Sequence, residues 1–522
     1  MRLVRSVPAL RALLAQSPHQ TVGLVPTMGA LHAGHTSLIE RSRRQNDCTV
    51  VSIFINPLQF VPGEDFDRYP RQLDTDSELC AAWGVDVVFA PAPETFQPSN
   101  DPRKQIAISP PPAMLEHLCG PWRPGHFSGV LTVVLKLLQT VQPQRAYFGQ
   151  KDAQQLALIR RLVDDLQVPV EIVGCPIVRE SDGLALSSRN RYLASTERSV
   201  GSELYRGLQR AHALFSRGER QTNAILDSAR EHYHHHPQLR VQYLQLVEPD
   251  TLNTIETVER EGLLAVAAFI GKTRLIDNVL LRDRRPIVAI DGPAGAGKST
   301  VARLVAATLA LKYLDTGALY RALTWAAMQR GIAVDDEIGL VDLAAIAPVR
   351  LETTVRPDLP TRVWIAEREV TDEIRTLAVT SQVSAVSALG GVRRELVRQQ
   401  RAIGRWGGVV MEGRDIGTHV FPEAELKIFL TASVRCRAER RQLELVAKGE
   451  RVTLEDLKVQ IETRDHRDSQ RAIAPLRRAP DAVAIDTNLL TPPEVATRIE
   501  QLYHQRLADM ASVGQRLGRS DA

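Results

Sequence analysis

The chain has 522 residues, of which 44% are hydrophobic and 24% are charged, and its formal net charge at pH 7 is +4. This length exceeds what one hydrophobic core supports, so we expect about two to four domains. The weak net charge argues against a nucleic-acid partner, and every apolar run is too short to span a membrane. The five cysteines include no C-x-x-C pair, which argues against a disulfide framework and predicts a reducing, cytoplasmic compartment.

Short strand-like runs alternate with helical stretches along the whole chain. Residues 1–16 fit either a targeting peptide or a first surface helix, and we favour the helix because a strand-like run begins by Thr21. The alternation predicts an α/β fold with parallel sheets in both halves. The charged segment RDRRP, residues 282–286, is the predicted linker between the halves, and a weaker boundary is expected at 193–200.

The segment IVAIDGPAGAGKST, residues 287–300, has the P-loop pattern between an apolar strand and a helix. Its glycines let backbone N–H groups turn towards phosphate oxygens, and the start of the following helix favours the same anion. Lys298 is predicted to reach the outer phosphates, and Ser299 to offer its hydroxyl to Mg²⁺. The predicted ATP-binding residues of this half are Gly292, Gly295, Gly297, Lys298, Ser299 and Thr300.

Polar residues further along could receive the phosphate. The segment VVMEGRDIGTHVFP, residues 409–422, places charged side chains just past a strand end, where ligand sites of open α/β sheets lie. In TRDHRDSQR, the spacing i, i+3, i+7 predicts Arg464, Arg467 and Arg471 on one helix face. Such a trio alone fits a solvated basic face; beside a P-loop, we favour arginines that stabilise a phosphoryl group during transfer.

Six motifs in order, IDGPAGAGKST, YLDTGALYR, TSQVSAV, EGRDIGT, KIFLTAS and RDxRDxxRxxAPL, resemble the bacterial cytidylate kinase family over residues 286–507. The resemblance implies phosphoryl transfer from ATP to CMP or dCMP, with Lys298 and Arg464 as catalytic residues. The chain departs from the family pattern at two places. The stretch before Arg393 is slightly longer than expected, and Glu412 stands where some relatives have Asp. The CMP-binding residues that it implies are Thr316, Arg321, Ser381, Arg393, Arg414, Asp415, Arg464, Asp468 and Arg471.

In the first half, VPTMGALHAGH, residues 25–35, follows an apolar strand and holds His32 and His35 at a predicted helix start. An isolated pair of this kind is often structural, but neighbouring glycines in a strand–turn–helix setting favour phosphate binding by neutral imidazoles. Alone, the motif indicates nucleotidyl transfer. Lys151 in FGQKDAQQ and Arg189 in SDGLALSSRNRYL are the cations that an attacked α-phosphate needs, and FINPLQF adds the amides of Asn56 and Gln59.

These segments, with RPGHFSGV and TRLIDN, resemble the pantothenate synthetase family over residues 1–281. The resemblance implies that ATP activates pantoate as an acyl adenylate, releasing pyrophosphate, and that β-alanine then displaces AMP. It implies pantoate binding by Gln59 and Gln155, and catalytic roles for His32, His35, Lys151 and Arg189. The ATP-binding residues that it implies are Met28, Gly29, His32, His35, Gly149, Lys151, Asp152, Ser187, Ser188 and Arg189.

Mg²⁺ is expected in this half too, with Asp74 as its candidate ligand, and the resemblance implies a homodimer through the first half. A closing loop is expected around residues 60–67, where Pro62 and Gly63 favour mobility. The histidine run 232–236 is expected to be solvated at a helix end rather than to bind a metal.

The two resemblances predict a Rossmann-like nucleotidyltransferase-type domain with a small α+β lid subdomain, followed by a P-loop nucleoside monophosphate kinase domain. The predicted boundaries are 1–194, 195–281, a linker at 282–286, and 287–510. We interpret the chain as two enzymes with independent sites. Two alternatives are a second half that senses nucleotide without turnover, which its complete arginines argue against, and an RNA-binding second half, which lacks aromatic platforms.

Overall fold

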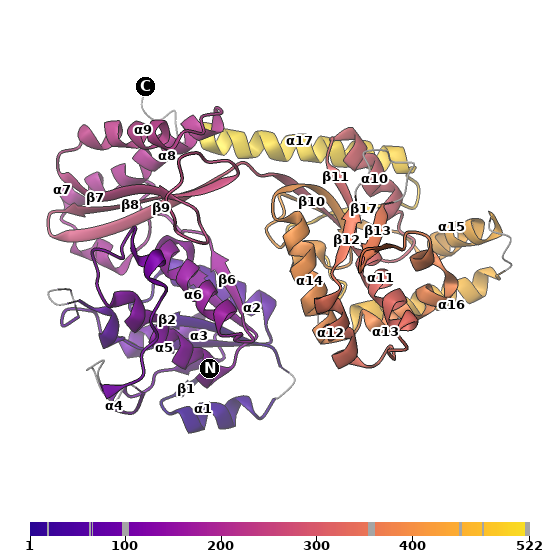
Figure 1. Cartoon of the computed structure of the whole chain (residues 1–522), viewed down its shortest axis with the longest axis horizontal. Helices are drawn as coiled ribbons and strands as arrows, with labels where there is room; N and C mark the ends of the chain where they lie inside the picture. The colour runs from indigo at the N-terminus through magenta and orange to yellow at the C-terminus, as the bar shows by residue number, and fades with distance from the viewer. Residues whose placement is uncertain are drawn as a thin grey trace. The chain divides into compact units, whose positions relative to one another are not determined.

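The computed structural model describes residues 1–17, 20–61, 64, 66–96, 104–352, 361–447, 452–471 and 474–516. The chain divides into two compact units, Met1–Asp283 and Arg284–Ala522, coloured indigo to magenta and orange to yellow in Figure 1. Strand β9 (Thr273–Arg282) ends the first unit and β10 (Arg285–Asp291) begins the second. Only Asp283 and Arg284 lie between these strands, so most of the segment expected to be a linker is strand.

A six-stranded parallel sheet forms the centre of the first unit. In spatial order its strands are β1 (Arg2–Val4), β4 (Val87–Phe89), β3 (Cys48–Ile53), β2 (Val22–Thr27), β5 (Arg145–Gly149) and β6 (Glu171–Cys175). The chain runs outward from β2 to β4 and returns to place β5 on the other side of β2. The gap between β2 and β5 is therefore a topological switch point, where ligands bind in open sheets of this kind.

Helices cover both faces of this sheet. Apolar side chains from one face form a core with α1, α4, α5 and α6, and those from the other face pack with α2 and α3. The central strands β2, β3 and β4 are therefore buried on both sides, which accounts for continuous apolar runs such as that of β3. The helices are α1 (Val7–Leu14), α2 (Ala33–Gln45), α3 (Leu73–Ala82), α4 (Pro93–Phe96), α5 (His126–Val141) and α6 (Ala153–Asp165).

A three-stranded antiparallel sheet, β7-β8-β9, completes the first unit with three helices. Alternate residues of β8 belong to two different cores: Leu264 and Val266 pack with the helices, whereas Leu263 and Ala265 join the core under the six-stranded sheet. This double burial explains the unbroken apolar run GLLAVAAFI. The additional elements are α7 (Ser195–Gly201), α8 (Glu203–Ser216), α9 (Thr222–His234), β7 (Leu239–Val247) and β8 (Glu261–Ile270).

The second unit is built on a five-stranded parallel sheet with β10 at its centre. Helices α10 (Lys298–Thr308) and α17 (Pro492–Arg516) cover one face, and α14 (Gly390–Gly404) packs on the other. Helix α17 continues past residue 510, the expected end of this domain. The other strands in spatial order are β11 (Lys312–Asp315), β15 (Gly407–Gly413), β16 (Leu426–Thr431) and β17 (Val483–Asp486).

Two attachments complete the second unit. A small antiparallel sheet, β12-β13-β14, shares a core with three helices and α14, and the helical pair α15–α16 has a small core of its own. The α/β fold with parallel sheets predicted for both halves is thus confirmed. The remaining elements are α11 (Thr316–Gln329), α12 (Glu337–Ile346), β12 (Val349–Glu352), β13 (Arg362–Ile365), β14 (Arg368–Glu369), α13 (Leu377–Val386), α15 (Val434–Ala447) and α16 (Leu454–Ser469).

Across the described parts of the chain, we find no helix with the length and apolar character needed to cross a membrane. All five cysteines are unpaired, and four of them are buried.

Candidate active sites

The loop after β2 lies at the switch point of the first sheet and is held by a carboxylate from α3. Asp76, which is buried, accepts hydrogen bonds from the backbone N–H groups of Ala30 and Leu31, both at 2.9 Å. Gly29 has φ +84°, a conformation in which a side chain would be strained, and an added Cβ would lie 2.8 Å from the Asp76 carboxylate. These contacts fix the path of the chain into α2, which has His32 as its N-cap.

The two histidines of this loop are neutral hydrogen-bond donors. The Nδ1 atom of His32 accepts from the Gly34 N–H at 3.1 Å, and that of His35 accepts from the His32 N–H at 3.3 Å. Burial lowers the pKa of His32 to about 4 and that of His35 to about 3, with the nearby Lys151 charge contributing to both. Since each Nδ1 accepts, the ring proton of each imidazole is on Nε2, which is left to bond a ligand.

Gln59, predicted to hold pantoate, lies beside the histidine loop on the short helix η1 (Pro57–Gln59). Its Nε2 lies 2.7 Å from the Met28 sulfur, and its Oε1 accepts from Asn56 Nδ2 at 3.2 Å. Asn56 also donates to the Gly129 carbonyl, and an added Cβ at Gly129 would meet the Leu58 backbone at 2.2 Å. This close packing fixes η1 against α5, so the Gln59 amide is held next to Met28.

Three further residues connect α5 to the backbone of Gln59. Arg123 forms a two-bond ion pair with Glu64, each bond 2.7 Å long, and donates to His126 Nε2 at 2.9 Å. Because Nε2 accepts, His126 Nδ1 carries the proton and donates to the Gln59 carbonyl at 2.6 Å. Burial and the Arg123 charge lower the pKa of His126 to about 4. Sequence reasoning assigned no role to this network, although RPGHFSGV was part of the resemblance.

Of the expected closing loop, Pro62 and Gly63 lie outside the described residues. The described residues beside them include Glu64, whose pKa is lowered by the Arg123 guanidinium against the opposing effect of burial.

Lys151 lies on η4 (Gln150–Asp152), directly after β5, on the opposite side of the switch point. Asn278 of β9 donates to the backbone carbonyls of Gln150 and Lys151, so the position of this turn is set from the small sheet. A cavity of about 40 Å³ adjoins it; its lining includes Lys151, Asp152, Gln155, His126 and Asn278. Gly149, which is predicted to bind ATP, faces open space, because a Cβ added there would meet no atom within 4 Å.

The segment predicted to bind phosphate after β6 forms η5 (Ser188–Tyr192), with Ser187 as its N-cap accepting from the Arg189 N–H at 3.3 Å. The Arg189 charge contributes to lowering the pKa of Glu64, after the larger effect of Arg123. The Arg191 charge helps to lower the pKa of His32. Arg191 was not predicted as a site residue; it is the second arginine in SSRNR, and this motif offers no local signal to separate the two.

Asp74, the candidate Mg²⁺ ligand, is exposed on α3, whereas Asp76 two residues later reaches the histidine loop. The expectation of a solvated histidine run is wrong at His232 and only partly met at His236, which is half-buried and lies 3.3 Å from Glu203. His232 is buried and makes a 2.9 Å contact with Glu203, whereas His234 and His235 are exposed.

In the second unit, the P-loop follows β10 as predicted and leads into α10. Gly292, Gly295 and Gly297 all have positive φ, and a Cβ at Gly292 would come within 2.2 Å of the Leu430 carbonyl oxygen. Lys298 is 6% exposed and donates to the Pro293 carbonyl at 2.8 Å. Burial and then the Arg414 charge lower the pKa of Lys298 to about 7. The Lys298 side chain is therefore folded across the loop.

Glu412, at the end of β15, joins the P-loop to the neighbouring strand. Its carboxylate accepts from Ser299 Oγ at 2.9 Å and from the Tyr313 hydroxyl, and its carbonyl accepts from Thr316 Oγ1 at 2.7 Å. Burial, followed by the charge of Asp315, raises the pKa of Glu412. A carboxylate beside the P-loop serine is the oxygen-donor pair that a hard cation such as Mg²⁺ prefers.

Every residue predicted to bind CMP lines one open cavity of about 2180 Å³, together with the P-loop residues from Gly295 to Thr300. Arginines in it are held by carboxylates: Arg321 by Asp315, Arg393 by Asp415, and Arg414 by Asp468 at 3.0 Å. Ser381 is exposed at the cavity and donates to the Ala378 carbonyl. The remaining predicted members of the lining are Thr316, Arg464 and Arg471.

The prediction that three arginines share one helix face is wrong for Arg471. Helix α16 ends at Ser469, and the chain turns back so that the Leu476 N–H donates to the Asp468 carbonyl. Arg464 is on the helix, where desolvation and the Arg414 charge lower its pKa to about 10. Both arginines nevertheless line the same cavity as Arg467.

The second unit also contains carboxylates that sequence reasoning missed. Asp291, at the end of β10, accepts from the N–H groups of Ile416 and Gly417, and burial raises its pKa to about 6. Asp465 pairs with Arg437, which also donates to the Ala294 carbonyl of the P-loop. These contacts join segments that are far apart in the sequence, so no local sequence pattern predicts them.

The comparisons with known proteins agree with both halves. A family described as pantoate-beta-alanine ligase matches residues 2–280, and a family described as cytidylate kinase matches residues 288–505. The bifunctional pantoate ligase/cytidylate kinase of Synechococcus sp. (strain JA-3-3Ab) is 56% identical, covering 97% of this chain and 98% of that protein. The protein of the same description from Nostoc sp. (strain PCC 7120) is 52% identical and covers 97% and 100%.

Among solved structures, the pantothenate synthetase of Thermus thermophilus is similar to the first unit. It is 45% identical with a TM-score of 0.52, and the match covers 54% of this chain and 100% of that chain.

Proposed function

The chain belongs to the family of bifunctional pantoate ligase/cytidylate kinases, and from this premise we propose how its residues carry out two reactions. The first unit condenses pantoate with β-alanine at the expense of ATP, giving pantothenate, AMP and pyrophosphate. The second unit transfers the γ-phosphoryl group of ATP to CMP. The observation that supports this proposal is that each unit has a loop suited to phosphate after a strand of its parallel sheet, the His32–His35 loop after β2 and the P-loop after β10.

In the first unit, the pantoate carboxylate attacks the α-phosphorus of ATP, and pyrophosphate leaves. We propose that the Nε2–H groups of His32 and His35 and the cations Lys151 and Arg189 stabilise the charge that builds up on the phosphate oxygens. Gln59 and Gln155 hold pantoate. The β-alanine amine then attacks the acyl carbon, and AMP leaves. The proposed ATP contacts also include Met28, Gly29, Gly149, Asp152, Ser187 and Ser188.

In the second unit, we propose that Lys298 and Arg464 stabilise the phosphoryl group in transit between ATP and the CMP phosphate. Arg393 is paired with Asp415, and Arg414 is paired with Asp468. The negative charge of the substrate would therefore compete with carboxylates that these arginines already bind. Use of dCMP beside CMP remains part of this proposal.

Mg²⁺ is the proposed cofactor of both reactions. In the second unit, Ser299 and Glu412 provide the oxygen donors that would hold it, and it would offset charge on the transferred phosphates. In the first unit, Asp74 remains the proposed ligand, but it is exposed on α3 and the steps above depend on other residues.

We also propose a homodimer formed through the first unit, which light scattering would test. We further propose a cytoplasmic location, which the five unpaired cysteines support.

A substrate panel on the purified chain tests the function. Pantoate, β-alanine and ATP should give pantothenate with AMP, and CMP with ATP should give ADP in the absence of pantoate. ADP formation with CMP as the sole acceptor distinguishes a working kinase from a sensing module. Titration with an ATP analogue should require two equivalents per chain; saturation by one equivalent would contradict the proposal of two sites.

A further inference from the structure

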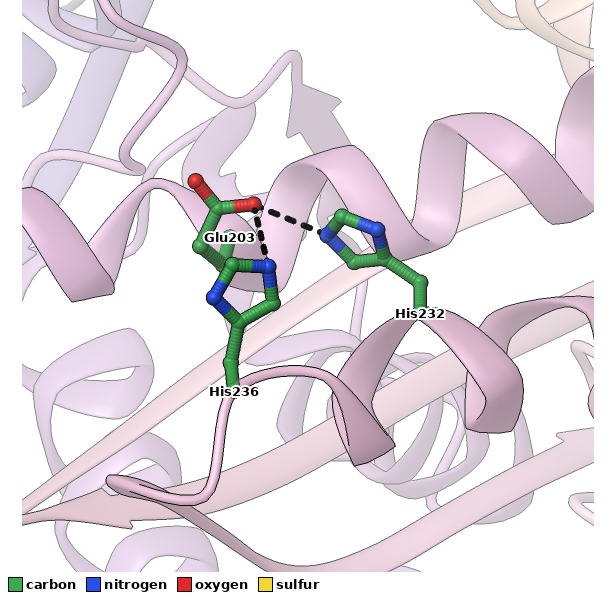
Figure 2. A group of neighbouring side chains, drawn as sticks. All are labelled: Glu203, His232 and His236. Carbon is green, nitrogen blue, oxygen red and sulfur yellow. Dashed lines mark hydrogen bonds and ion pairs between the residues drawn. The ribbon is translucent and has the colours of Figure 1, made fainter.

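Three side chains of the small subdomain, Glu203, His232 and His236, meet at one point (Figure 2). Glu203 begins α8, His232 lies in the last turn of α9, and His236 follows that helix. Both imidazoles face the same carboxylate oxygen: His232 Nε2 lies 2.9 Å and His236 Nε2 lies 3.3 Å from Glu203 Oε2. The three possible ligand atoms all lie within 4.8 Å of one another.

This spacing fits a tetrahedral transition-metal ion. Zn²⁺ bonds of about 2.0–2.1 Å to nitrogen and oxygen at the tetrahedral angle separate neighbouring ligand atoms by about 3.3 Å. The separations between Glu203 Oε2 and the two imidazole nitrogens, 2.9 and 3.3 Å, lie close to this value, and all three ligand atoms lie within 4.8 Å of one another. Two histidines and a carboxylate are, moreover, a ligand set that proteins use for Zn²⁺ with one position left for water.

The surroundings orient the ligands. Arg206 Nη1 donates to the second oxygen of Glu203 at 2.7 Å, which leaves Oε2 facing the imidazoles. Outer contacts of this kind hold the first ligands of metal sites in position. The side chains of Glu203 and His232 are 9% and 11% exposed, whereas that of His236 is 32% exposed. The cluster therefore has two fixed ligands and one more accessible side, through which an ion and a water ligand can enter.

We propose that Glu203, His232 and His236 form a transition-metal site, with Zn²⁺ as its preferred ion, that joins the start of α8 to the end of α9. Imidazole ligands favour such ions over Mg²⁺, so this site is separate from the Mg²⁺ that the two reactions are proposed to use. None of the three residues belongs to a proposed substrate site, so we assign the ion no part in either of the two reactions. Glu203 and His232 lie 29 positions apart, which is why the histidine run alone did not predict the site.

Zinc binding by the full-length, untagged chain tests the proposal. After removal of metal with a chelator, calorimetry with ZnCl₂ should show one equivalent bound, and Co²⁺ should give the visible bands of a low-coordinate site without thiolate charge transfer. His236→Gln removes the most accessible ligand, and we expect it to weaken zinc affinity at least about tenfold. Zinc should raise the unfolding temperature of the unaltered chain but not that of His236→Gln.

The same histidine run provides a matched control. His234→Gln combined with His235→Gln changes two exposed histidines outside the cluster and should leave zinc affinity unchanged. Pantothenate formation by each variant checks that the first unit is folded, and His232→Gln provides a second loss-of-ligand variant. The proposal is overturned if the unaltered chain binds no zinc, if His236→Gln binds it equally well, or if the control pair loses as much affinity.

Discussion

The two proposed ATP sites differ in the charge state of the residues on their loops. In the cavity beside the P-loop, Arg393 and Asp415 are charged groups that are almost entirely buried, and each balances the other. At the first unit's loop, His32 and His35 are uncharged at neutral pH because burial lowers their pKa values. In the proposed mechanism, the first unit therefore adds neutral donors to the cations Lys151 and Arg189, whereas the second unit uses cations that are already paired with buried carboxylates.

The largest expected effect is on the stability of the second unit, when the buried Arg393–Asp415 ion pair is broken. In Arg393→Ala, Asp415 is left buried without its partner, which we expect to destabilise this unit by about 3–5 kcal/mol. The kinase transition in calorimetry can be identified as the one that CMP and ATP shift upward. It should move to lower temperature in the variant, whereas the other transition stays in place. An unchanged kinase transition would show that the pair does not contribute to folding.

The next prediction separates the two sites. Lys298→Ala should lower CMP phosphorylation about 100- to 1,000-fold, the cost of removing one preorganised donor to a developing charge. Pantothenate formation should not change, because the two products share no intermediate. Both rates are measured on the same preparation. An equally severe loss of pantothenate formation would contradict the independence of the sites.

How far sequence predicts these sites depends on how local their contacts are. The P-loop was predicted residue by residue because its glycines and Lys298 act within one turn of the chain. Asp76 was missed because its partners, the backbone N–H groups of Ala30 and Leu31, lie about 45 positions earlier and carry no side-chain signal.

Helix ends and pairings account for the other differences. Arg471 was placed on a helix by periodicity, but α16 ends at Ser469, and Arg471 lies beyond its C-cap residue Gln470. Arg393 and Asp415 were each predicted to bind CMP, but their mutual ion pair depends on how α14 packs beside β15, which the sequence pattern alone does not specify. The parallel sheets followed directly from alternating strand and helix patterns.

A smaller effect tests the neutrality of the first unit's imidazoles. The pKa of His35 is lowered from 6.5 to about 3, so the unfolded chain binds a proton between these values that the folded chain does not. The free energy of unfolding therefore does not depend on His35 titration above about pH 6.5, and it decreases as the pH falls from 6.5 towards 3. Its slope is about 1.4 kcal/mol per pH unit. In urea unfolding at pH 7 and pH 5, His35→Gln should lose less stability on acidification than the unaltered chain; an equal loss would show that His35 is not buried in neutral form.

The smallest expected effect concerns His126 as a positioning residue for pantoate. His126→Leu removes the Nδ1–H donor to the Gln59 carbonyl, a hydrogen bond that contributes about 1 kcal/mol, so we expect KM for pantoate to rise about fivefold with little change in kcat. His126→Asn places an amide N–H near the position of Nδ1–H and should recover part of the loss. The unfolding temperature of the first unit serves as the folding control. If both variants instead lost kcat while KM stayed constant, Gln59 would not be held for pantoate through this contact. The hydrogen bond from His126 to Gln59 would then act on the transition state itself.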